Sequence, residues 1–275
     1  LACDKPYAEA KTVLFGAPFD GTTSYRPGTR FGSAVIRRES YGIETYSPYQ
    51  DRDLEDCAVM DAGDLELPFG DTEKALCMIE ERAAHILRDG KRPFLLGGEH
   101  LVTLGAVRAV VRKYPDLCIV HFDAHTDLRE DYLGVKLSHA CVLRRCHELT
   151  GDKRIAQFGI RSGLREEFAW GREHTFLHPF GFDGLEEVLE AFAGRPVYFT
   201  LDLDVLDPSV FPGTGTPEPG GVSFEQLRRA ATLVCSRADV VALDVNELSP
   251  PYDQSGASTA VACKIVREML LALKG

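Results

Sequence analysis

The sequence of 275 residues lacks three features that would each indicate a different class of protein. It has no excess of basic residues, because its formal net charge is −11, whereas proteins that bind nucleic-acid phosphates need basic patches. It has no apolar run near the roughly 18 residues of a membrane-spanning helix. Its eight cysteines contain no Cys-x-x-Cys pair, so we interpret them as reduced thiols of a cytoplasmic protein. We therefore expect neither nucleic acid nor a membrane as a partner.

The remaining composition, with 44% hydrophobic and 27% charged residues, is that of an ordinary globular protein. Short apolar segments predict strands, and amphipathic or capped segments between them predict helices. We expect strands at 12–15, 57–61, 93–96, 117–120, 155–159, 197–203 and 240–243. We expect helices starting near 33 and 139, one ending at 113, and others at 72–88, 185–192, 224–235 and 258–274. This alternation predicts a single α/β domain over residues 1–275, with a mainly parallel sheet covered by helices on both faces.

The most informative segment follows the predicted strand at 117–120. It places Asp123, His125 and Asp127 at alternate positions. If the backbone stays extended beyond the strand, the three side chains point to one face, because successive residues of a strand alternate sides. Two carboxylates and an imidazole that converge in this way form a candidate metal site. The alternative is a solvated acidic turn.

A second acidic cluster favours the metal site over the solvated turn. Asp202 and Asp204 follow another apolar segment and are again two residues apart. Burial of four carboxylates without cations would be prohibitively costly. His100, which follows the Gly97-Gly98 turn at a third strand end, is expected to join them. We interpret these residues as the halves of one binuclear metal centre at the carboxyl ends of the strands, where open α/β sheets bind ligands.

Taken together, these motifs resemble those of the ureohydrolase family, which contains arginases, agmatinases and their relatives. The matching segments are Gly-Gly-Glu-His at 97–100, Asp-Ala-His-Thr-Asp at 123–127, Ser-His at 138–139, Asp-Leu-Asp-Val-Leu-Asp-Pro at 202–208, and Glu247 within 244–250. They cover most of the chain in the family's order. The resemblance implies a three-layer α/β/α fold and a homo-oligomer, either a trimer or a hexamer.

The resemblance also implies two Mn²⁺ ions per subunit and a role for each matched residue. In the family, Asp123 and Asp202 would bridge the two ions. One ion would also take His100 and Asp127, and the other would take His125 and Asp204. Such a pair of ions lowers the pKa of water towards about 7 and promotes its attack on a guanidinium carbon.

Three residues would act on the substrate or on protons. By the resemblance, Asp127 would relay a proton to the departing amine, Glu247 would bind the guanidinium group as a planar partner, and His139 would exchange protons with solvent and contact the substrate. Two of these residues have alternative, structural roles. Glu247 could be a loop carboxylate that caps a turn, and His139 could be a surface residue or lie at the start of a helix.

The substrate is expected to be a small cationic guanidino compound. The loop at 128–138 lacks the Asn/Ser/Thr-rich pattern by which arginases hold an α-carboxylate, and segments 25–32 and 213–221 look like those of agmatinases. We therefore predict hydrolysis of agmatine to putrescine and urea. Guanidinobutyrate, guanidinopropionate and arginine remain alternatives, because Arg129, Lys136 or Arg161 could hold a carboxylate.

Two alternatives come from other functional classes. Deacetylases of related fold use a single zinc ion, and non-catalytic, metal-binding members of the family are expected to have lost ligands or the guanidinium-binding carboxylate. The presence of all six predicted ligands and of Glu247 disfavours both.

Overall fold

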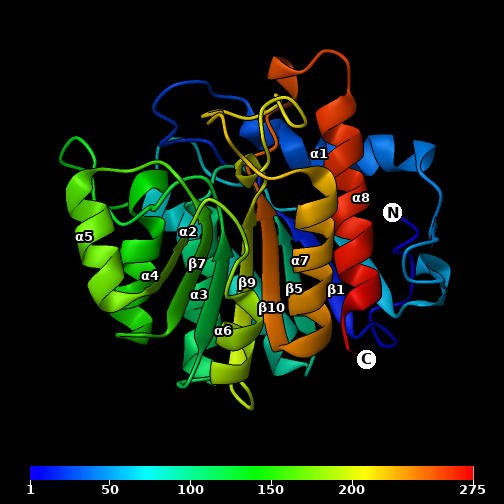
Figure 1. The fold of residues 1–275 in the computed structure, drawn as a ribbon. Coiled ribbons are helices and arrows are strands. Elements are labelled where there is room, and N and C mark those ends of the chain that lie inside the picture. Colours follow the sequence, from blue (N-terminus) through cyan, green and yellow to red (C-terminus); the bar gives the residue numbers. More distant parts are fainter. Residues whose placement is uncertain (275) are drawn as a thin grey trace.

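The computed structural model describes residues 1–274 and is built around one eight-stranded sheet (Figure 1). All neighbouring strands of this sheet pair in parallel. In order across the sheet, the strands are β4 (Val59–Asp64), β1 (Thr12–Gly16), β5 (Arg92–Leu96), β10 (Asp239–Asn246), β9 (Pro196–Asp202), β6 (Cys118–Phe122), β7 (Ile155–Ile160) and β8 (Phe176–Pro179). The order is not sequential, because the last two strands of the chain, β9 and β10, lie at the centre of the sheet between β5 and β6.

Helices cover both faces of the sheet and complete three layers. One face packs against α2 (Thr72–Arg88), α3 (Val102–Lys113) and α4 (Val142–Thr150). The other packs against α1 (Gly32–Glu39), α6 (Leu185–Ala191), α7 (Phe224–Arg237) and α8 (Ala257–Ala272). Alternate residues of β6 enter the two cores, Ile119 on one side and Val120 on the other. Because both faces are covered, central strands such as β5 and β6 are largely apolar, and the predicted α/β/α architecture is confirmed.

Sequence patterns found the long elements and missed the short peripheral ones. The helix predicted at 72–88 is α2 without change, and Gly90, with φ of 72°, follows its last residue closely. The missed elements are α5 (Arg165–His174), β8, and a small antiparallel ribbon of β2 (Tyr46–Ser47) and β3 (Arg52–Asp53). β8 has only four residues, none of them fully buried, so its apolar pattern is weak. Within residues 1–274 no helix combines the length and apolarity needed to cross a membrane.

A capping box starts α7, as the sequence predicts. The Ser223 hydroxyl accepts a hydrogen bond from the Gln226 backbone N–H at 3.3 Å, and the Gln226 side chain accepts one from the Ser223 N–H at 2.9 Å. Ser223→Ala removes one half of this exchange, so we expect the free energy of unfolding to fall by about 1 kcal/mol. Urea denaturation would measure this loss. Ser236→Ala, near the other end of the same helix, is the matched control and should cost less.

Candidate functional site

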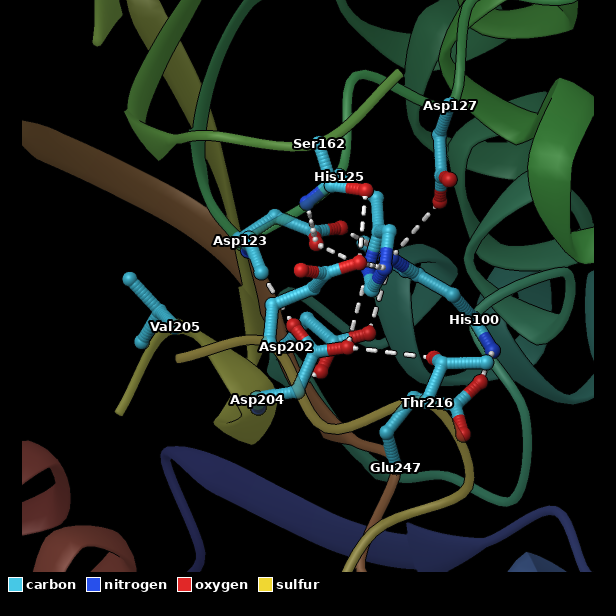
Figure 2. Close-up of polar contacts among 12 residues, drawn as sticks. His100, Asp123, His125, Asp127, Ser162, Asp202, Asp204, Val205, Thr216 and Glu247 are labelled. Carbon is cyan, nitrogen blue, oxygen red and sulfur yellow. Dashed lines mark hydrogen bonds and ion pairs between the residues drawn. The ribbon is translucent and has the colours of Figure 1, made fainter. Parts of the chain in front are cut away.

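The candidate site lies at the carboxyl ends of the four central strands, β5, β10, β9 and β6. Asp202 is the last residue of β9, Asp123 directly follows β6, and Glu247 directly follows β10. His100 comes four residues after β5. Parallel strands end at the same edge of a sheet, so these four side chains, distant in sequence, are brought together (Figure 2).

Two glycines allow the chain to turn sharply between β5 and His100. A Cβ atom at Gly97 would lie 1.9 Å from Oδ1 of Asn246, and one at Gly98 would lie 1.9 Å from the carbonyl oxygen of Phe19. No side chain fits at either position without movement of these neighbours. The close approach also joins this turn to the end of β10, because the Glu247 N–H donates to the Gly98 carbonyl at 3.0 Å.

His100 faces a group of carboxylates through an atom that has no hydrogen-bond partner. Its buried Nδ1 lies 3.0 Å from Asp123 Oδ2, 3.2 Å from Asp127 Oδ2 and 3.4 Å from Asp202 Oδ2. Its Nε2 is 2.9 Å from the Thr200 hydroxyl. A neutral imidazole protonated on Nε2 would therefore present its Nδ1 lone pair to three carboxylates, an arrangement that a cation satisfies.

His125 forms the second half of the cluster. Its Nδ1 lies 3.0 Å from Asp204 Oδ2 and 3.4 Å from Asp123 Oδ1. Asp123 thus directs one carboxylate oxygen towards His100 and the other towards His125. Figure 2 shows both imidazoles pointing into the space that these carboxylates surround. All six side chains predicted as ligands meet here.

Two residues of the site adopt left-handed backbone conformations, which are uncommon outside glycine. Asp127 has φ of 51° and Glu247 has φ of 68°, a conformation that costs on the order of 1 kcal/mol for such residues. The backbone is therefore not extended through Asp127, contrary to our expectation. β6 ends at Phe122, and a turn, not strand alternation, directs Asp127 towards His100. Such strain is concentrated at functional sites.

The electrostatics of the cluster favour a bound cation. The four aspartates are at most 7% exposed. Burial, followed by the charge of Asp123, raises the pKa of Asp127 to about 7. Burial and the charges of Asp204 and Asp123 raise the pKa of Asp202 well above its usual range. Carboxylates that would otherwise take up protons are stabilised as anions by divalent ions. The donor set of four carboxylates and two imidazoles suits a hard ion such as Mn²⁺.

Sequence reasoning missed the residues that orient the ligands. His121 is fully buried, and its Nε2 is 2.8 Å from Asp123 Oδ2. The Gln157 side-chain amide lies 3.1 Å from His121 Nδ1 and donates to the Thr126 carbonyl at 2.8 Å. These contacts assign the proton of His121 to Nε2, where it is donated to Asp123. The alternation that identified 123 and 125 also includes 121, so this signal was present in the sequence.

Glu99 was also missed, although it lies in a recognised motif. Its buried carboxylate accepts hydrogen bonds from the backbone N–H and hydroxyl of Thr22 and from the hydroxyl of Thr23. The Thr22 hydroxyl in turn accepts from the backbone N–H of His139 at 3.1 Å. Glu99 therefore holds the loop after β1 against the segment that carries His139.

His139 lies at the mouth of the site, outside the carboxylate cluster. It begins a short 3₁₀ segment, His139–Cys141, that precedes α4. Ser138 occupies the N-cap position of this segment, but its side chain makes no capping hydrogen bond. The His139 Nε2 lies 3.3 Å from the Ser24 hydroxyl. Burial lowers the pKa of His139 to about 4, so its imidazole is neutral at pH 7.

A cavity of about 280 Å³ opens above the cluster. It is lined by residues from several connections, including Ser24, His100, His125, Asp127, Arg129, Tyr132, His139, Ser162, Leu164, Thr216 and Glu247. Its volume fits a small molecule rather than a polymer. The cavity places the carboxylate cluster, Glu247 and His139 around a common space, which is the arrangement of a small-molecule hydrolytic site.

Comparisons with known proteins agree with this architecture. The arginase family profile matches residues 10–272. Agmatinase from Bacillus subtilis (strain 168) is 49% identical over 275 residues, covering 98% of this chain and 94% of the relative. A crystal structure from Clostridium difficile has 50% identity and a TM-score of 0.95, covering 98% of both chains. That of agmatine ureohydrolase of Thermoplasma volcanium has 36% identity and a TM-score of 0.88, covering 98% of this chain and 92% of the other. The chain belongs to the arginase family.

Proposed function

We propose that this protein is an agmatinase-type ureohydrolase, which hydrolyses agmatine to putrescine and urea. The observation that carries the proposal is the position of Glu247, whose carboxylate lines the same cavity as the cluster around His100 and His125. A planar carboxylate beside a hydrolytic centre is suited to a planar guanidinium group. Membership of the arginase family and the similarity to agmatinases support the same reaction.

We assign two Mn²⁺ ions per subunit to the cluster. The residues that would hold them are His100 and Asp127 on one side, His125 and Asp204 on the other, and Asp123 and Asp202 between. The close approach of His100 Nδ1 and His125 Nδ1 to opposite oxygens of Asp123 supports this division. When bound, such a pair supplies an activated water and neutralises charge that develops on the substrate.

The protein side chains position the substrate and move its protons. Glu247 is anchored because its Oε1 accepts from the His100 backbone N–H at 2.8 Å, so its carboxylate is held in place before the guanidinium arrives. Asp127 lines the cavity beside the proposed metal centre, so its carboxylate is placed to carry a proton towards the departing amine. His139 lines the same cavity, so its imidazole is placed between the site and solvent to exchange that proton.

The side chains that could bind a substrate carboxylate favour an uncharged or cationic substrate tail over an acidic one. Arg129 Nε is 3.4 Å from Glu167 Oε2, and its guanidinium lies 4.5 Å from the centre of the Tyr132 ring. Arg161 donates to several backbone carbonyls, including that of Asp204 at 2.8 Å. Lys136 Nζ is 3.5 Å from Glu130 Oε1. Arg129 and Arg161 are therefore already engaged, and neither Lys136 nor Arg161 lines the cavity, which favours agmatine over guanidinobutyrate, guanidinopropionate and arginine.

Urea release by the Mn-loaded protein tests the function directly. Agmatine, arginine, guanidinobutyrate and guanidinopropionate should be compared in parallel at equal concentration. We expect fast turnover of agmatine alone. Preference for an acidic guanidino compound would contradict agmatine as the substrate. It would still support hydrolysis of a guanidino group to urea. Turnover of none of the four, with both ions bound, would contradict the function.

His121 provides a test of the metal site that does not change a ligand. His121→Ala removes the hydrogen bond that orients Asp123, so we expect the Mn²⁺ affinity to fall about 10- to 100-fold, as for other outer partners of metal ligands. Equilibrium dialysis measures this change. His178→Ala is the matched control, since His178 stacks on Phe158 at 4.5 Å and should leave Mn²⁺ affinity unchanged.

We further propose that the protein acts in the cytoplasm as a homo-oligomer. All eight cysteines are free thiols in the structure, and six are buried, which fits a reducing compartment. A trimer or hexamer follows from the family resemblance alone. Light scattering on the purified protein distinguishes these assemblies from a monomer.

A further inference from the structure

A second cluster of metal-binding side chains lies away from the cavity, where α4 and α5 end. His147 belongs to the last turn of α4, Asp152 to the loop that follows, and His174 is the last residue of α5. The two imidazoles converge on one oxygen: Asp152 Oδ1 lies 2.8 Å from His147 Nε2 and 2.7 Å from His174 Nδ1. The three donor atoms all lie within 4.8 Å of one another.

We propose that His147, Asp152 and His174 form a second metal site, which takes one ion of the Zn²⁺ or Ni²⁺ class. Tetrahedral ligands about 2.0–2.1 Å from an ion are about 3.3 Å apart. The two oxygen-to-nitrogen distances need to widen by only about half an ångström to admit an ion. The three ligands come from three separate elements, and their donor atoms already lie within 4.8 Å of one another.

The surroundings of the three ligands favour binding over a simple surface hydrogen bond. The histidine side chains are mostly shielded, with 15% exposure for His147 and 26% for His174, whereas Asp152 is 64% exposed. The rings are fixed by Trp170, which stacks on His174 at 4.3 Å and lies edge-on to His147 at 4.6 Å. Rigid imidazoles lose little entropy on binding, and the open side leaves room for water to complete the coordination.

The donor set separates this site from the one beside the cavity. Two imidazoles and one carboxylate suit Zn²⁺, Ni²⁺ or Cu²⁺, which bind nitrogen donors more strongly than Mn²⁺ does. The carboxylate-rich cluster around Asp123 suits Mn²⁺. One chain would thus hold different metals at its two sites.

The position of this site between α4 and α5 means that a bound ion would affect the stability of the protein. The opposite ends of the same two helices approach the cavity, through His139 before α4 and through Leu164 and Glu167 at the start of α5. α4 and α5 are neighbours in the fold (Figure 1), and they already meet through the Arg144 guanidinium, which lies 4.0 Å from the centre of the Trp170 ring. An ion held by His147, Asp152 and His174 would cross-link their far ends, so we expect Zn²⁺ to raise the Tm of the Mn-loaded protein.

Trp170 is the only tryptophan of the chain and contacts both imidazoles of the proposed site, so its emission reports on ion binding there. Ni²⁺ should be titrated into the Mn-loaded protein while its tryptophan emission is followed. We expect saturable quenching that corresponds to one Ni²⁺ per chain. The same titration of Asp123→Asn should still show quenching, because that variant alters only the site beside the cavity.

Single substitutions then identify the ligands. Asp152 is exposed, so the Asp152→Asn variant should fold normally. Loss of a residue that only supports a metal ligand already weakens metal binding about tenfold or more, so loss of the ligand Asp152 should weaken Ni²⁺ binding by more than about tenfold. His174→Ala should abolish both the saturable quenching and the rise in Tm with Zn²⁺. His85→Ala is the matched control, because His85 is a surface histidine 3.6 Å from the carboxylate of Asp89, and it should behave as wild type. Quenching that is not saturable, or that survives both Asp152→Asn and His174→Ala, would reduce the finding to an adventitious ion only and overturn the proposal.

Discussion

Asp123→Asn should abolish urea release: we expect activity on agmatine to fall by more than about 1,000-fold, since the substitution removes a ligand charge from the centre that activates water. The purified variant should also hold fewer than two Mn²⁺ ions per chain. Steady-state urea assays and metal analysis of the same preparation measure both effects.

The geometry around Asp123 explains why even an isosteric amide cannot replace it. His121 donates to Oδ2 at 2.8 Å, and the His125 backbone N–H donates to Oδ1 at 2.5 Å. An asparagine amide has one oxygen and one NH₂ group, so either orientation places N–H against N–H. On the proposed assignment the variant therefore loses a charge shared by both ions, and it also leaves a buried donor without an acceptor.

Asp116→Asn is the matched control for this experiment. Asp116 lies shortly before β6, is 59% exposed, and pairs with Arg154 and Arg195 on the surface, so full activity and metal content are expected. Thermal melting of both variants separates loss of metal from loss of fold. An Asp123→Asn protein that keeps most of its activity and both ions would contradict the assignment of Asp123 as a shared ligand.

The fold was predictable from the sequence because its buried elements carry strong local patterns. Central strands such as β5 and β6 are almost wholly apolar, since both faces of the sheet are covered. Amphipathic helices such as α2 show their period clearly. Peripheral elements lack such patterns: few residues of α5 are fully buried, and β8 is a short edge strand. Their positions are determined by tertiary packing, which local patterns do not encode.

The site was predictable to the extent that its residues lie in continuous motifs. The six predicted ligands and Glu247 follow strand ends, and parallel topology then brings them together. The residues that hold them in place come from distant segments. Glu99 contacts Thr22, which is 77 residues away, and His100 contacts Thr200, which is 100 residues away. Sequence patterns carry no direct signal for such pairs, so these roles required the structure.

Glu247→Gln separates substrate binding from metal binding. We expect kcat/KM for agmatine to fall by about 100- to 4,000-fold, corresponding to the roughly 3–5 kcal/mol lost when one partner of a buried ion pair is removed. The Mn²⁺ content should be unchanged, because the glutamine oxygen can still accept the hydrogen bond that the His100 N–H now donates to Glu247 Oε1 at 2.8 Å. Parallel urea assays and metal analysis measure the two quantities.

The backbone at Glu247 makes this substitution especially informative. Its φ of 68° is a strained conformation that both glutamate and glutamine must adopt, so the variant tests the charge and not the turn. Glu186→Gln is the matched control, since Glu186 is 64% exposed and 3.7 Å from Arg237, and it should retain full activity. If Glu247→Gln keeps the wild-type kcat/KM, the Glu247 carboxylate does not bind the guanidinium group. Loss of Mn²⁺ together with activity would instead assign Glu247 to the support of His100, so each outcome gives this residue a different role.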